Sequence, residues 1–146
     1  MTNFGEFAAY QAWANTITLN ALNNTKNETA NRVFAHLLGA NLVWGSRLAG
    51  TQPDCEVAPS WGLEECEVMI GRITELYNGL PTHLSEQTVI HYTTSTGTPS
   101  SSSVAQIMMQ LWAHNAYHRG EIAGYIRQQG GVVMDTDYII YARSHA

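Results

Sequence analysis

Apolar side chains recur at three- and four-residue steps in four segments of the chain, which is the spacing of one face of an α-helix. Each segment ends at residues that stop helices, such as Gly50 and Gly130-Gly131. The spacing therefore predicts four long helices, over residues 4–23, 29–49, 61–79 and 103–129. A short last helix is predicted after them, capped by Asp135 and containing Tyr138, Ile139 and Tyr141.

Residues 86–98 break this helical pattern. The stretch 88–94 is rich in threonine and other strand-forming residues, and Gly97-Thr98-Pro99 supplies a turn, so a small hairpin or an irregular excursion is expected. Ser100–Ser103 then provides an N-cap for the fourth long helix. The predicted fold is all-α: a four-helix bundle with a short strand-like excursion between helices three and four, in a single domain over residues 1–146.

Composition narrows the possible partners. The chain is 45 % apolar and 13 % charged, which is typical of a folded domain, and its net charge of −5 argues against a nucleic-acid partner. The N-terminus lacks a signal-peptide pattern, and no apolar run approaches the roughly 20 residues that span a bilayer. We therefore expect a cytoplasmic protein that does not bind membranes. Cys55 and Cys66 are too far apart for a CxxC motif, so reduced thiols are expected.

Two of the six histidines, His114 and His118, are four residues apart in the fourth predicted helix. Side chains at this spacing project side by side. On a helical wheel they continue the inward stripe that runs through Ile107 and Leu111. His36 lies in the inward stripe of the second predicted helix.

Three imidazoles on inner helix faces need partners, because burying unpaired polar groups costs free energy. One divalent metal ion would satisfy three nitrogen lone pairs at once, and neutral imidazole suits Zn, Ni, Cu and Fe. The alternative is that each histidine is a separate core or boundary residue bonded to a carbonyl group. The spacing alone leaves both interpretations of His36, His114 and His118 open. His83, His91 and His145 are expected to face solvent.

The chain resembles the DinB family of small metal-dependent proteins. The resemblance rests on residues 114–123, HNAYHRGEIA, and on residues 34–44, FAHLLGANLVW. Residues 10–15, YQAWAN, and 136–139, TDYI, also match in the right order. The resemblance implies a four-helix bundle, often dimeric, with a metal ion bound by the histidines at the matching positions, His36, His114 and His118.

One residue departs from the family pattern. Family members commonly carry glutamine where this chain has Glu121, which lies on the same helix face as His114 and His118. Its carboxylate has two interpretations: an acceptor for an imidazole N–H beside the metal, or a solvated or ion-paired surface group. No residue is assigned as catalytic.

Three protein ligands would leave coordination positions open, as in catalytic zinc sites. The expected ion is Zn or Ni, with Fe, Mn or Cu as alternatives. Some relatives use low-molecular-weight thiols, so the resemblance favours a metal-dependent enzyme, such as a thiol S-transferase or a hydrolase, with a small-molecule substrate. The alternative is a metal-binding stress-response protein without catalysis. No GxSxG motif supports a serine hydrolase.

Overall fold

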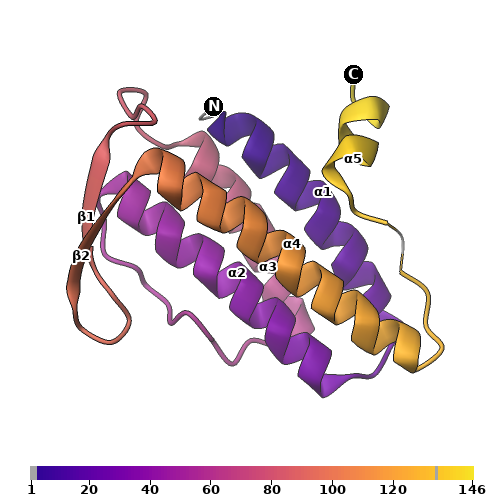
Figure 1. Cartoon of the computed structure of the whole chain (residues 1–146). Helices are drawn as coiled ribbons and strands as arrows, with labels where there is room; N and C mark the ends of the chain where they lie inside the picture. The colour runs from indigo at the N-terminus through magenta and orange to yellow at the C-terminus, as the bar shows by residue number, and fades with distance from the viewer. Residues whose placement is uncertain (1–2, 134) are drawn as a thin grey trace.

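The computed structural model describes residues 3–133 and 135–146, and its regular structure is mostly helical (Figure 1). Within those residues there are five helices and a two-stranded antiparallel sheet. In chain order they are α1 (Phe4–Asn23), α2 (Glu28–Ala49), α3 (Leu63–Asn78), β1 (Val89–Thr93), β2 (Pro99–Ser103), α4 (Val104–Gln128) and α5 (Tyr138–Ser144). The helices begin and end within two residues of the limits that the apolar spacing predicts. None of them is long and apolar enough to cross a membrane.

Side-chain caps explain where three of the long helices begin. The Asn3 and Asn27 side chains accept hydrogen bonds from the backbone of Glu6 and Ala30 at the starts of α1 and α2. Ser103 caps α4 as the sequence predicts: its hydroxyl accepts a hydrogen bond from the Gln106 backbone N–H. The Gln106 side-chain oxygen in turn accepts one from the Ser103 backbone N–H, which completes a capping box.

The segment between α3 and α4 forms a hairpin, which confirms the predicted excursion. Its second strand, Pro99–Ser103, was not predicted, because a run of serines has little strand propensity. Pairing with β1 overrides that propensity, with Val89 opposite Ser103 and Thr93 opposite Pro99. The hairpin packs against α2 through Trp44 and Tyr92, whose ring centroids are 5.0 Å apart.

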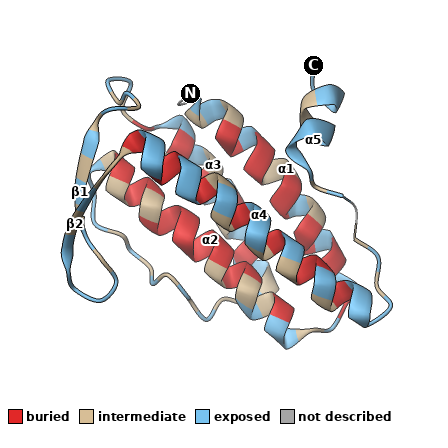
Figure 2. Ribbon diagram, viewed as in Figure 1, coloured by how far each residue is buried: buried red, intermediate tan, exposed pale blue. Residues whose placement is uncertain are grey.

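The predicted cap of the last helix was wrong. The N-cap position of α5 is occupied by Asp137, whose side chain makes no capping bond. Asp135 instead accepts a hydrogen bond from the Asp137 backbone, so it orders the turn that precedes the helix. No residue of α5 is buried, and Figure 2 shows this helix on the outside of the molecule.

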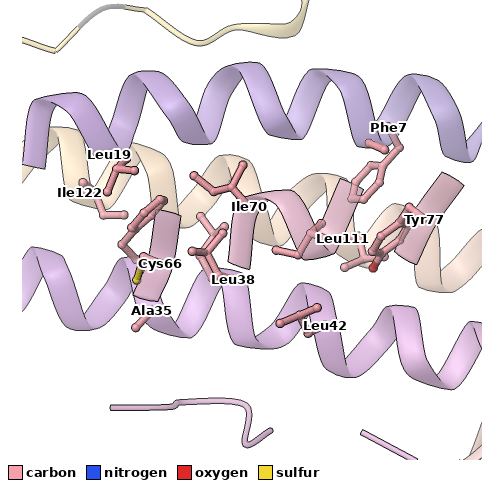
Figure 3. Packing of buried hydrophobic residues seen from close by; sticks show 14 of the residues in the cluster. Phe7, Leu19, Ala35, Leu38, Leu42, Cys66, Ile70, Tyr77, Leu111 and Ile122 are labelled. Carbon is pink, nitrogen blue, oxygen red and sulfur yellow. The ribbon is translucent and has the colours of Figure 1, made fainter. Parts of the chain in front are cut away.

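The long helices bury their apolar faces against one another. Helix α1 packs mainly on α3, and α2 packs on both α3 and α4. This arrangement is compatible with an all-α bundle. Figure 3 shows side chains from all four helices in one cluster, including Phe7, Leu38, Ile70 and Leu111. Cys66 is buried in the same cluster, and both Cys55 and Cys66 are free thiols, as predicted.

A pair of asparagines interrupts this apolar interior. Asn41 of α2 and Asn115 of α4 are fully buried, and each amide donates to the other's carbonyl oxygen, at 2.7 and 3.0 Å. Asn41 also donates to the Leu37 carbonyl, and its own backbone carbonyl accepts a bond from the Tyr77 hydroxyl of α3. The reciprocal bonds can form only when the two residues lie directly opposite, so they fix the register of α2 against α4.

We expect Asn115→Ala to lower the free energy of unfolding by about 2 kcal/mol, because it leaves the Asn41 amide buried without its partner. Urea denaturation measures this change. The control is Asn20→Ala, at an exposed position of α1, which should change stability by less than about 0.5 kcal/mol. Equal effects of the two substitutions would show that the asparagine pair does not hold α2 and α4 together.

Candidate metal centre

The structure brings together the imidazoles of His36, His114 and His118, between α2 and α4. The ring centroids are 5.0 Å apart for His36 and His114, 4.9 Å for His36 and His118, and 4.4 Å for His114 and His118. One nitrogen from each ring lies within 4.8 Å of the others, and all three residues are half-buried. Such a group could hold a metal ion.

The loop after α2 orients His36. Its Nδ1 lies 2.8 Å from the carbonyl oxygen of Val57, and because a carbonyl only accepts, Nδ1 carries the proton and donates. The other ring nitrogen, Nε2, therefore keeps its lone pair and points toward His114. The loop can approach because α2 has a glycine at position 39, where a Cβ would lie 2.6 Å from Pro59.

Glu121 orients His118. The two residues are one turn apart on α4, and His118 Nδ1 lies 2.9 Å from a carboxylate oxygen of Glu121. The carboxylate accepts a hydrogen bond from the Nδ1–H group, which leaves the Nε2 lone pair of His118 free to act as a ligand. Of the two interpretations of Glu121 from the sequence, the geometry corresponds to an acceptor for an imidazole N–H.

His114 has the least favourable environment of the three for a positive charge. Burial, together with the neighbouring His118 and His36 rings, lowers its pKa to about 4. The ring is therefore neutral at physiological pH, the form that binds metals. Its Nδ1 is buried and has no hydrogen-bond partner among the described residues.

The distance between His36 and His114 fits a shared cation. Their Nε2 atoms are 3.1 Å apart. Two nitrogens bound to one tetrahedral ion at the usual Zn–N distance are roughly 3.3 Å apart. In the metal-free protein, the same contact is a hydrogen bond in which His114 Nε2–H donates to His36. A bound ion would replace that proton, so the donor set and its spacing suit an imidazole-binding divalent metal.

The predicted inward stripe of α4 needs a correction. It continues from Leu111 through Asn115 and Arg119, which are buried, while His114 and His118 lie one position away, on the flank that faces α2. That flank is half-buried, which leaves the imidazoles accessible. His83, His91 and His145 are exposed, as the sequence predicts.

Sequence reasoning missed two supports of this site. The Val57 carbonyl is a backbone group and carries no residue-type signal, although a glycine inside a helix and Pro59 in the next loop hint at a close approach. The Asn41–Asn115 pair lies within the core stripes of both helices. Two polar residues at core positions could have indicated a buried hydrogen bond between the helices, but an analysis of apolar spacing does not consider polar residues.

The chain is thus a helical protein with a three-histidine group that could hold a metal ion. A model of the DinB family matches residues 1–145, which is nearly the whole chain. The chain belongs to the DinB family, as the resemblance in its histidine segments indicated. Comparisons with curated proteins and with solved structures found no match.

We expect alanine at position 36, 114 or 118 to remove most of the bound metal, because two imidazoles hold an ion far less tightly than three. Elemental analysis of protein purified without a metal-affinity tag measures the metal content per chain. His83→Ala is the matched control and should retain full occupancy. Glu121→Ala should retain metal but weaken its binding by about 10-fold to 100-fold. Full occupancy in His114→Ala would exclude this site.

The half-buried, neutral His114 makes the metal-free protein sensitive to acid. Its folded pKa of about 4 lies below the unfolded value near 6.5. Between these values the unfolded chain binds more protons, so stability is full above about pH 6.5 and falls as the pH drops toward 4. Urea denaturation of chelator-treated protein from pH 7 to 5 should show this loss. His114→Gln should show a flatter profile; an unchanged slope would contradict the assignment.

Proposed function

We propose that this protein binds one divalent metal ion at an open site formed by His36, His114 and His118, and that it is a metal-dependent enzyme. The observation that carries the proposal is the convergence of three imidazoles without a fourth side-chain ligand. Within the described residues, no cysteine or carboxylate joins the group. Solvent or substrate would then complete the coordination shell, as in catalytic zinc sites.

The proposed reaction is a thiol S-transfer or a hydrolysis. A bound divalent ion supplies Lewis acidity, which activates a thiol or water at neutral pH. Zn or Ni is the proposed ion, and Fe, Mn or Cu are the other outcomes of elemental analysis. His36 and His118 would hold their ligand nitrogens in place, because Val57 and Glu121 fix the opposite ring nitrogens.

The thiol in such a reaction would come from the substrate. Burial raises the pKa of Cys66 to about 11, and it also raises the pKa of Cys55. Both side chains therefore remain protonated near neutral pH, and a protonated thiol is a poor nucleophile. This supports a low-molecular-weight thiol as the small-molecule partner.

A non-catalytic role is the second candidate. The three histidines come from two helices, one from α2 and two from α4, so a bound ion would tie these helices together. A stress-response protein that stores or senses metal would use the same geometry. The two candidates differ in whether the ion accepts an additional ligand from solution.

We further propose a cytoplasmic homodimer in which each chain forms a four-helix bundle. Helix α4 has no charged Asp, Glu, Lys or Arg from Val104 to His118, and its outer face exposes 70 % of Met109 and 72 % of Tyr117. An uncharged face that exposes large apolar side chains is typical of subunit interfaces. Sedimentation at micromolar protein concentration should give twice the chain mass.

We expect chelated protein to keep its helical content, because the four long helices bury a common apolar core that contains none of the three histidines. Far-UV circular dichroism before and after metal removal measures this. The absorption spectrum of a cobalt-substituted form should change when a small thiol such as 2-mercaptoethanol is added. A helical signal that collapses on chelation, together with a cobalt spectrum indifferent to thiol, would favour the non-catalytic role.

A further inference from the structure

A second site lies on the other side of α4. A cavity of about 280 Å³, partly open to solvent, is lined by α1, α4 and the residues that lead into α5. Three of the α4 residues that line it are small: Ala116, Gly120 and Ala123 recur at steps of four and three, and so share one helix face. A Cβ added at Gly120 would meet no atom within 4 Å. The small side chains therefore leave a space between α4 and α1.

Aromatic rings form one wall of this cavity. The Tyr10 and Trp112 rings stack with centroids 5.3 Å apart, and Tyr138 stands edge-on to both, at 5.2 and 5.4 Å. The Tyr10 hydroxyl donates to the Thr136 carbonyl at 2.7 Å, which holds the segment before α5 over the cavity. This wall offers apolar surface to an aliphatic or aromatic group.

Arg119 supplies a buried positive charge. The residue is only 5 % exposed, and its guanidinium donates to Gln11 Oε1, Asn15 Oδ1 and the Tyr10 hydroxyl. All three acceptors are neutral, and none of the carboxylates in the described chain forms an ion pair with it. Burial lowers the pKa of Arg119, but arginine stays protonated in proteins. Buried charges are normally paired, so this one lacks an expected counter-ion.

Three further charged residues line the cavity: Arg127, Asp135 and Asp137. They are exposed, and within the described residues they form no ion pair with Arg119 or with each other. The lining thus presents two cations and two carboxylates that do not neutralise one another directly. A simple anion would be repelled by the aspartates, and a simple cation by the arginines.

We propose that this cavity binds a small zwitterion with an apolar side chain, of the size and chemistry of an α-amino acid. Its carboxylate would accept hydrogen bonds from Arg119, which uses three of its five N–H groups within the protein. Its ammonium group would face Asp135 and Asp137, and its side chain would lie against Tyr10, Trp112 and Tyr138. The site is separate from the histidine group, which lies on the α2 side of the same helix.

The probe is L-leucine, titrated into the full chain while the indole N–H signal of Trp112 is followed by NMR. Two analogues each lack one charge: 4-methylpentanoate has no ammonium group, and 3-methylbutylamine has no carboxylate. We expect leucine to shift the signal at millimolar concentration. Each analogue should bind at least about tenfold more weakly than leucine, because one charged hydrogen-bonding group is lost.

Two glycines of α4 give a matched pair of variants. Gly120 and Gly124 are both exposed, and a Cβ at either would meet nothing within 4 Å, but only Gly120 lines the cavity. Gly120→Leu should abolish leucine binding by filling the space, while Gly124→Leu should bind as the unaltered protein does. Both variants should keep the helical circular dichroism signal, since leucine favours helices.

The proposal is overturned if the Trp112 signal does not respond to leucine at tens of millimolar. It is also overturned if either analogue binds as well as leucine, or if Gly120→Leu and Gly124→Leu bind equally. Asp135→Asn combined with Asp137→Asn gives an independent check at exposed positions. This double variant should weaken leucine binding about tenfold and leave 4-methylpentanoate binding no weaker than before.

Discussion

The reciprocal hydrogen bonds between Asn41 and Asn115 constrain the rest of the structure most strongly. Apolar faces tolerate sliding, because many pairings of leucine and isoleucine bury similar areas. Two buried amides do not, because each would lose its partner if α2 moved along α4. Asn115 directly follows His114, and Asn41 lies five residues after His36. The pair therefore holds the two helices at the register in which the imidazoles converge.

The register of α2 against α4 is not sufficient for the imidazoles to bind a cation. Each ring must also present a lone pair, and its tautomer decides this. For His36 the tautomer depends on the Val57 carbonyl, and for His118 on the Glu121 carboxylate. The first support needs Gly39, which lets a loop approach α2, and the second needs only the helical spacing within α4. The site thus combines one long-range support with one local support.

The amino-acid sequence predicted the local features well and the tertiary features poorly. Helical periodicity located the long helices to within two residues, because apolar burial and helix geometry impose the same period. The spacing of His114 and His118 and the stripe position of His36 pointed to their meeting. The strand Pro99–Ser103 and the Val57 carbonyl depend on pairing and loop packing, which residue types do not encode. The apolar spacing also placed His114 and His118 within the buried stripe of α4, whereas they lie on its flank. It did so because a charged residue such as Arg119 is not counted as a core position.

Helix α4 keeps the histidines and Arg119 on different sides, because adjacent residues on a helix point about 100° apart. His118 faces α2, where its ring lies beside that of His36. Arg119, the next residue, faces α1, where it donates hydrogen bonds to the neutral side-chain oxygens of Gln11 and Asn15. Leu111, Asn115 and Ile122 form the middle of the buried stripe, Arg119 lies at its edge toward α1, and His118 lies on the opposite flank. A guanidinium on the histidine side would repel a cation, so turning it toward α1 keeps that side favourable for metal. The same placement leaves a buried positive charge beside a cavity, and this charge makes a ligand with a carboxylate favourable there.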